Sequence, residues 1–204
     1  MEQLSQIKLR IPILLGSCRI GRESLKVAKF ILAELVKQDR IDTELIDLGE
    51  YKLPMLEERL QDSSNPPDNV LRFCSKLGQA DGILLVTPEY KNGYPGVLKN
   101  ALDYLEPQAL KYKPIGICTV SSGRFGGLDC LAQLRLVSLA LGALPIPDKL
   151  PVPNVKELFD ENGNLSDLKF QARPFRKESF AIANAISNRP REEKNFLFNQ
   201  SSSF

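Results

Sequence analysis

The sequence predicts an α/β fold, a doubly wound sheet of five parallel strands with helices on both faces. Short apolar runs that suit buried strands alternate along the chain with amphipathic stretches that suit helices. The run Gly82–Val86 is the clearest example, since its leucine, isoleucine and valine residues fit a strand buried on both faces. A polar loop and a helical pattern follow it directly. The repeated order βαβαβα indicates a parallel sheet built from crossover units.

The composition indicates one globular domain. The chain has 204 residues, of which 43% are hydrophobic and 25% charged, so it can bury a sizeable core without disulfides or metals. We expect a single domain over residues 1–188. The polar segment 189–204 is predicted to be a tail that is disordered or bound by a partner.

The charge and the hydropathy pattern exclude several classes of function. A net charge of +2 gives no basic field for nucleic acid or an anionic membrane surface. No apolar run approaches the roughly 20 residues that a spanning helix needs. The first residues lack the basic and then apolar character of a secretory signal. We therefore expect a cytoplasmic protein.

The chain contains no histidine, which removes histidine general bases, His-ligated metals and the Ser-His-Asp triad together. The chain has four scattered cysteines with no Cys-x-x-Cys spacing: Cys18, Cys74, Cys118 and Cys130. We therefore expect reduced thiols, and we expect no metal site. An enzyme built on this chain must use carboxylate, lysine, tyrosine or serine side chains, or borrow its chemistry from a cofactor.

The first half of the chain contains two strands and two helices. Leu9–Gly16 is predicted to be the first strand, with Pro12 marking an irregular point because it cannot donate to the ladder. Apolar residues then recur at helical spacing from Leu25 to Val36. Thr43–Leu48 alternates enough to suggest an edge strand, a long irregular connection covers 51–65, and Asn69–Leu77 is predicted to be a helix.

The second half follows the same alternation. After Gly82–Val86, a helix is expected from Pro95 to Leu105, since proline suits the first helical turn. Ile115–Val120 is predicted to be the fourth strand and Leu128–Leu141 a helix with more than one apolar face, which suggests a subunit interface. The last strand is expected near Ala143–Pro147, followed by a helical stretch that starts at Leu165.

The first candidate site is the loop that joins the first strand to its helix, residues 16–24. Ser17, Arg19, Arg22 and Ser24 lie in it, just before the helix begins. The free amides and the positive dipole end of a helix N-terminus suit a phosphate. A helix capped by Ser17 or Ser24, with the arginines in water, is the alternative that the loop alone favours.

The second candidate site follows the third strand. Pro88 ends the strand, and Glu89, Tyr90, Lys91, Asn92 and Gly93 form a polar loop. Loops at the carboxyl ends of parallel strands line the ligand crevice. The peptide groups of this loop could therefore form hydrogen bonds with the edge of a planar ligand. An ordinary connection between a strand and a helix is an equally good interpretation.

The third candidate site follows the fourth strand, where Ser121, Gly123 and Arg124 lie in the glycine-rich segment 121–127. Glycine allows the backbone to approach a ligand closely, so this loop is predicted to form the far wall of the crevice. A flexible turn is the alternative.

The segment from Pro88 to Asp103 resembles the Pro-Glu-Tyr-Asn loop and the following helix of the NADPH-dependent FMN reductases. This family contains flavodoxin-like quinone, chromate and azo-dye reductases. Lys91 departs from the pattern, which usually has asparagine there, although Asn92 follows. The family's phosphate loop is also similar to Gly16-Ser17-Cys18-Arg19, and Arg22 has no clear counterpart. The resemblance extends from about Leu9 to about Asp167.

The resemblance implies a flavodoxin-like fold that binds FMN. In this family the Pro-Glu-Tyr-Asn loop holds the edge of the isoalloxazine, the first loop binds the phosphate and the glycine-rich loop covers the ring. A cation at Arg124 could meet the phosphates of the nicotinamide cofactor. The implied cofactor-binding residues are Ser17, Arg19, Ser24, Pro88, Glu89, Tyr90, Lys91, Asn92, Gly93, Ser121, Gly123 and Arg124.

The implied activity is an NAD(P)H oxidoreductase that works by a ping-pong mechanism. NADPH or NADH passes hydride to FMN and leaves, and a quinone, flavin, metal oxyanion or azo compound then accepts it. Because the flavin N5 carries the hydride, no catalytic side chain is expected. The family also implies a homodimer or homotetramer.

Two other functions remain open at this point. A flavodoxin-type electron carrier would bind the same cofactor without turnover, but such carriers tend to be strongly acidic for docking and this chain is not. A non-catalytic module that binds flavin or a phosphorylated metabolite is the second alternative.

Overall fold

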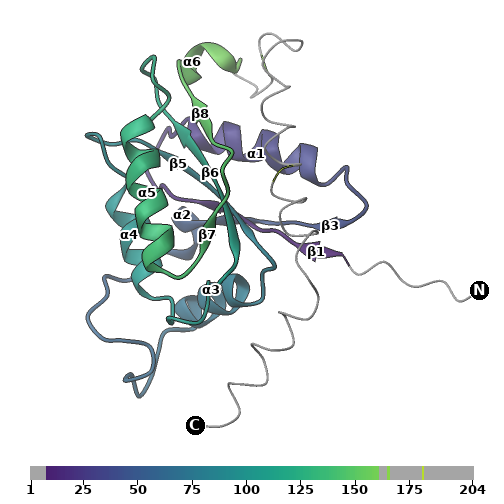
Figure 1. The fold of residues 1–204 in the computed structure, drawn as a ribbon. Coiled ribbons are helices and arrows are strands. Elements are labelled where there is room, and N and C mark those ends of the chain that lie inside the picture. The colour runs from purple at the N-terminus through teal and green to yellow at the C-terminus, as the bar shows by residue number, and fades with distance from the viewer. Residues whose placement is uncertain (1–7, 161–164, 166–180, 182–204) are drawn as a thin grey trace, which may run out of the picture.

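The computed structural model describes residues 8–160, 165 and 181 (Figure 1). The predicted domain boundary at residue 188, the tail 189–204 and nearly all of the helical stretch expected from Leu165 lie outside the described residues. None of the helices among the described residues is long and apolar enough to cross a bilayer.

Strands and helices alternate along the described chain, as the sequence predicts. In chain order the elements are β1 (Leu9–Arg10), β2 (Ile13–Leu15), α1 (Ser24–Leu35), β3 (Ile41–Asp42), β4 (Leu45–Asp47), α2 (Leu48–Tyr51), α3 (Asp68–Gly78), β5 (Ile83–Pro88), α4 (Gly96–Asp103), β6 (Pro114–Val120), α5 (Leu128–Ala140), β7 (Leu144–Pro145), β8 (Leu150–Val152) and α6 (Val155–Leu158).

The main sheet has the order β4-β2-β5-β6-β7, and all of its pairings are parallel. The short strands β1 and β3 precede β2 and β4 and pair with each other in parallel. The amide of Ile11 donates to the carbonyl of Asp42 at 2.8 Å, so the pairing continues toward β2 and β4. Pro12 lies at the break between β1 and β2, as expected of a residue that cannot donate to a ladder. The strand order is that of the flavodoxin-like doubly wound folds.

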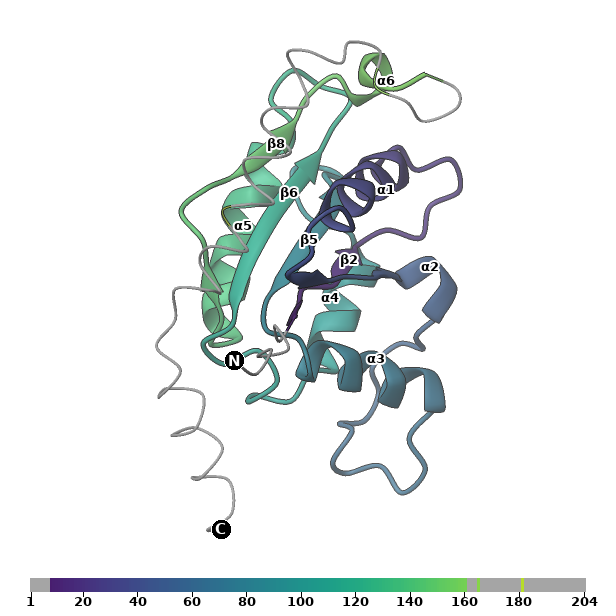
Figure 2. The same cartoon turned by 90° about the vertical axis from the view of Figure 1, so that its right-hand side faces the viewer.

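Two short segments share the fifth position of the sheet. β7 pairs with the start of β6 through Leu144 and Pro145, and β8 pairs with its end through residues 150–152, as Figure 2 shows for β8. The sequence predicted β7 and not β8. Proline is unusual within a strand, and β8 contains Pro151. Among the described residues, however, β8 pairs with β6 alone, and edge strands tolerate proline.

Both faces of the sheet are covered, which confirms the predicted fold class. Ile13, Leu15 and Val86 point to the side of α1, and Leu14 and Leu85 point to the side of α3, α4 and α5, following the alternation of a strand. Figure 1 shows α1 on the opposite side of the central strands from α4 and α5. This two-sided packing fixes the strand register, and therefore fixes where the loops at the strand ends lie.

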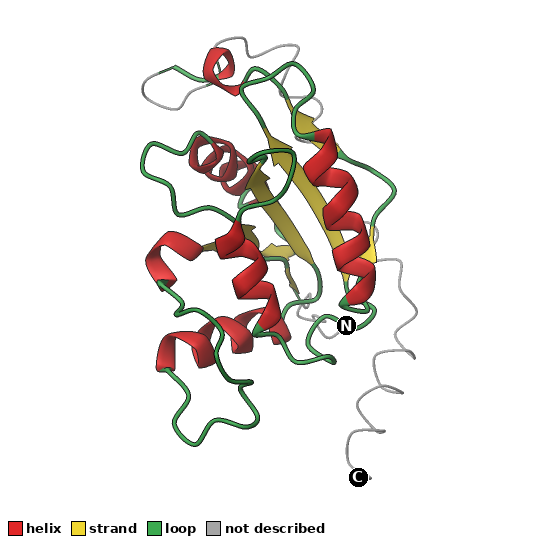
Figure 3. Ribbon diagram, turned by 90° about the vertical axis from the view of Figure 1, so that its left-hand side faces the viewer, coloured by secondary structure: helices red, strands yellow, loops and turns green. Residues whose placement is uncertain are grey.

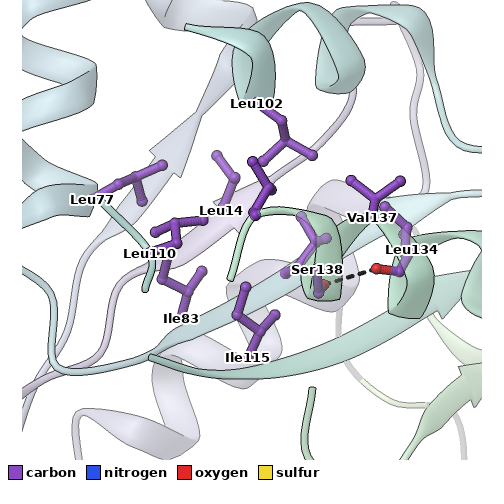
Figure 4. A pocket seen from close by; sticks show the side chains of 11 residues that line it. Leu14, Leu77, Ile83, Leu102, Leu110, Ile115, Leu134, Val137 and Ser138 are labelled. Carbon is purple, nitrogen blue, oxygen red and sulfur yellow. Dashed lines mark hydrogen bonds between the residues drawn. The ribbon is translucent and has the colours of Figure 1, made fainter. Parts of the chain in front are cut away.

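A cavity of about 10 Å³ lies between the sheet and the helices of the α3–α5 side (Figure 4). Leucine, isoleucine and valine side chains line it, and its one polar side chain, Ser138, already donates its hydroxyl to the carbonyl of Leu134 at 2.8 Å. So small and apolar a space is a packing defect rather than a ligand site.

The partly buried thiol of Cys74, on this side of the sheet, should make the stability of the protein depend on pH. Burial, with a smaller contribution from Glu106, raises the pKa of Cys74 from 9.0 to about 11. Between these values the unfolded chain loses the proton and the folded chain keeps it, so the unfolding free energy falls as the pH rises. We expect this fall between pH 9 and pH 11 to be steeper in the wild type than in Cys74→Ala, as measured by urea denaturation. Equal slopes would contradict the shift.

Candidate functional site

Three loops leave the same edge of the sheet. β2, β5 and β6 are neighbouring parallel strands, so the β2–α1 loop (residues 16–23), the β5–α4 loop (89–95) and the β6–α5 loop (121–127) all start at their carboxyl ends. Figure 3 shows the loops gathered beyond the arrowheads of the central strands. This edge is where open α/β sheets bind ligands.

Tyr90 joins the first two loops. Its hydroxyl lies 2.9 Å from Oγ of Ser17, and Nε of Arg19 donates to the same hydroxyl at 3.2 Å. Ser17 is fully buried and Arg19 is exposed, so the cluster runs from the protein interior to the surface. Residues that are more than 70 positions apart in sequence therefore meet at one point, as the sequence predicted.

The amino end of α1 has an unused polar group. α1 begins at Ser24, and Glu23 before it makes no capping hydrogen bond through its side chain. Ser24 is 1% exposed, yet its Oγ has no partner among the described residues. The alternative in which Ser17 or Ser24 caps the helix is therefore wrong. A buried hydroxyl without a partner beside the amides of a first helical turn suits an anion.

Arg22 has a structural role that sequence reasoning did not assign. Its guanidinium pairs with the carboxylate of Asp47, which also accepts from the amide of Gly49 at 2.9 Å. Asp47 is buried at the end of β4 and caps α2, so this pair ties the β2–α1 loop to the neighbouring strand. An acidic residue at the carboxyl end of a predicted strand was the available signal.

The β5–α4 loop contains a tight turn. The amide of Tyr90 donates to the carbonyl of Gly93 at 2.8 Å, and the amide of Gly93 donates back at 3.1 Å. Lys91 and Asn92 between them have φ values of 52° and 62°, as in a type I′ turn. The turn uses two peptide groups that the sequence assigned to a ligand. Among the described residues, the amides of Lys91 and Asn92 have no partner and remain available.

Helix α5 makes hydrogen bonds with this loop. The carboxylate of Glu89 accepts from the amide of Cys130 at 3.0 Å, and Gln133 donates to the carbonyl of Asn92 at 2.7 Å. The Cys130 thiol lies 3.8 Å from the carbonyl oxygen of Pro88, and burial followed by the charge of Glu89 raises its pKa to about 12. The thiol is therefore a protonated donor at neutral pH. The side chain of Glu89 therefore bonds to the helix and fixes the loop, and its contact with a cofactor stays a prediction.

The β6–α5 loop is fixed by its backbone. The amide of Ser121 donates to the carbonyl of Val152 at 3.0 Å, and the carbonyl of Gly123 accepts from the amide of Asn154 at 3.2 Å. Gly127 has a φ of 84°, and a Cβ there would lie 3.0 Å from Cβ of Thr119 and 3.3 Å from Cβ of Glu89. The glycines therefore permit close protein packing, and the loop lies directly against the β5–α4 loop.

Known proteins share the sequence pattern and the fold of this chain. The family model for NADPH-dependent FMN reductase matches residues 9–157. The chain belongs to this family. It is 30% identical over 169 residues to an FMN-dependent NADPH-azoreductase of Staphylococcus haemolyticus, with 79% of this chain and 87% of the relative covered. It is also 30% identical over 171 residues to a quinone reductase of Pseudomonas putida, with 81% and 87% covered.

A solved structure agrees in fold. The flavoenzyme NAD(P)H:(acceptor) oxidoreductase of Paracoccus denitrificans has a TM-score of 0.72 and 25% identity, covering 88% of this chain and 97% of its own. The predicted family, the flavodoxin-like fold and the class of FMN-dependent NAD(P)H oxidoreductase are confirmed.

The residues at the sheet edge fit FMN. The α1 end offers Ser24 Oγ and helix amides for a phosphate, and Arg19 supplies a cation on the loop that leads into this helix. The free amides of Lys91 and Asn92 suit the hydrogen-bonding edge of a flat ring. All twelve predicted residues lie on the β2–α1 loop, on the two neighbouring loops, at the first residue of α1 or at the end of β5. Their contacts to a cofactor remain a prediction.

The left-handed backbone conformation of Lys91 in this turn predicts that one substitution will stabilise the protein. The left-handed conformation at position 91 costs lysine roughly 1 kcal/mol, whereas asparagine adopts this conformation more readily. We expect Lys91→Asn to raise the unfolding free energy by about 0.5–1 kcal/mol in chemical denaturation. Lys91→Gln is the control, since it removes the charge and keeps the backbone cost. An equal gain in both variants would show that charge, not backbone conformation, is responsible.

Proposed function

We propose that this protein binds FMN at the carboxyl edge of its sheet and passes hydride from NADPH or NADH to a quinone or an azo compound. The observation that carries the proposal is the meeting of Ser17, Arg19 and Tyr90, which joins an anion-binding loop to a ring-binding loop. Membership of the NADPH-dependent FMN reductase family supports the reaction class. The azoreductase and quinone reductase relatives support the two acceptor classes.

Each loop has a part in holding the cofactor. Ser17, Arg19 and Ser24 would bind the phosphate, with the amides at the amino end of α1. Pro88 and the turn 89–93 would bind the ring edge, chiefly through the amides of Lys91 and Asn92. Ser121 and Gly123 would form the opposite wall, and Arg124, exposed on the same loop, would attract the phosphates of the nicotinamide cosubstrate.

Bound FMN supplies a group that accepts two electrons from NAD(P)H and gives them to the acceptor. In the net reaction NAD(P)H, a proton and a quinone become NAD(P)⁺ and a hydroquinone. The protein's own groups bind, orient and exclude water, which agrees with a chain that contains no histidine. The ordered turn and the rigid β6–α5 loop suit this positioning role because they need little rearrangement.

We propose the cytoplasm as the compartment and a homodimer or homotetramer as the assembly. The four cysteines lie in the described part of the chain and none of them forms a disulfide there, which is typical of a reducing compartment. On α5, Leu136 and Leu139 are 69% and 56% exposed, and with Ala132 they form an apolar stripe on the side of the helix away from the sheet. A second copy of the chain would cover this stripe.

Turnover tests the proposed function directly. Protein loaded with FMN is mixed with NADPH and a quinone, and NADPH absorbance is followed at several fixed concentrations of each substrate. The proposal predicts catalytic oxidation with parallel double-reciprocal lines. A yellow protein that does not turn over would be an electron carrier or a non-catalytic flavin-binding module. A protein that takes up no FMN would contradict the proposal altogether.

Substitution of Ser24 tests the proposed phosphate site, because it should raise the stability of the protein and weaken FMN binding. Because its buried hydroxyl has no partner, Ser24→Ala should raise the unfolding free energy of the FMN-free protein by about 1 kcal/mol. The same change should weaken FMN binding about tenfold, since one hydrogen bond to a charged phosphate is lost. The measurements are chemical denaturation and quenching of FMN fluorescence.

Ser138→Ala is the matched control, because Ser138 is also a buried helical serine but already donates to the carbonyl of Leu134. It should lower stability by about 1 kcal/mol and leave FMN binding at the wild-type level. Loss of FMN binding in both variants would indicate a general effect of losing a buried hydroxyl.

A further inference from the structure

The tip of the β6–α5 loop carries a large aromatic side chain in an exposed position. Phe125 is 62% exposed, although burying such a ring would stabilise the fold by about 2 kcal/mol. The ring therefore contributes little to folding where it lies. It stands on the loop that packs against the β5–α4 loop, at the edge of the sheet where the proposed cofactor site is.

The tip is held in place rather than free to collapse onto the surface. The carbonyl of Gly126 accepts from Oγ1 of Thr119 at 2.8 Å, and the amide of Val155 donates to the carbonyl of Ser121 at 3.2 Å. Gly126 has a φ of 64°, and a Cβ there would lie 2.8 Å from the backbone nitrogen of Val152. The frame on both sides of residues 124 and 125 is therefore rigid, and it presents these two side chains to solvent.

Arg124 lies over the Phe125 ring and keeps its charge available. Its guanidinium carbon is 4.6 Å from the ring centroid, a cation–π distance. No carboxylate of the described part of the chain pairs with Arg124. The guanidinium thus covers one face of the Phe125 ring, and the rest of the exposed ring lies next to a positive charge that no described carboxylate pairs with.

We propose that Arg124 and Phe125 select the electron acceptor, and that they favour flat aromatic acceptors that carry an anionic group such as a sulfonate. The acceptor's ring would pack on Phe125, and its anionic group would pair with Arg124. This inference rests on the proposed function, since the acceptor must reach the cofactor site. It assigns to Arg124 a role in acceptor choice beside the attraction of cosubstrate phosphates.

A pair of quinones that differ by one sulfonate group tests the proposal. The probes are 1,2-naphthoquinone-4-sulfonate and 1,2-naphthoquinone, each assayed with NADPH and the FMN-loaded enzyme. In the wild type the KM of the sulfonate should be the lower of the two, and added salt should reduce the difference. Arg124→Gln should raise the KM ratio of sulfonate to neutral quinone about three- to fivefold, the range of an exposed ion pair.

Further variants separate charge from packing. Arg124→Lys keeps the charge and should restore much of the ratio. Phe125→Leu should raise the KM of both quinones about threefold, since it removes aromatic packing and not charge. Arg59→Gln, an exposed arginine on the remote 52–67 connection, is the control and should leave the ratio at the wild-type value. FMN affinity and thermal denaturation are measured for every variant.

The outcomes distinguish the two proposals. If the wild type reduces neither these quinones nor an azo compound, the proposed function fails. If the wild type turns over and Arg124→Gln leaves the KM ratio unchanged, only the acceptor role fails. An increase confined to the KM of NADPH would show that the guanidinium serves the cosubstrate phosphates alone, and would likewise overturn the acceptor role.

Discussion

The hydroxyl of Tyr90 is the contact on which the rest of the site depends. It is hydrogen-bonded to Ser17 Oγ and to Arg19 Nε, and so holds the β2–α1 loop against the β5–α4 loop. Without this contact the two loops would share only a sheet edge. With it, the loop that we propose for the phosphate and the loop that we propose for the ring edge are held at a fixed spacing. Such preorganisation lowers the cost of ordering loops when a cofactor binds.

The sheet and α5 supply the support behind that contact. β2 and β5 are paired in register from Ile13 to Leu15, which brings the two loops out at neighbouring points. α5 is hydrogen-bonded to the β5–α4 loop through Glu89 and Asn92. The β6–α5 loop is hydrogen-bonded to β8. The only large groups that this framework leaves toward solvent on the third loop are Arg124 and Phe125. In the proposed function, this framework would position the cofactor, and the two exposed side chains would act on the acceptor.

The sequence predicted the fold class and the three loops because both follow from short-range pattern. Apolar runs, helical spacing and the segment Pro88 to Asp103 were all visible in neighbouring residues. The missed features depend on residues far apart in sequence. β8 has a proline that only an edge position explains, the Arg22–Asp47 pair spans two strands, and the capping of α5 by Glu89 could not be seen without the helix beside it. The type I′ turn was missed because Lys91 is an unusual residue for its backbone conformation.

The central claim is that one site binds the phosphate and the ring of the same cofactor. The most direct measurement compares the dissociation constants of FMN and riboflavin for the cofactor-free protein by fluorescence quenching. The two ligands share the ring and differ only in the phosphate. The account predicts that FMN binds at least about a hundredfold more tightly, since the phosphate adds several charge-assisted hydrogen bonds. Equal affinity for the two would contradict it, because the β2–α1 loop would then take no part in binding.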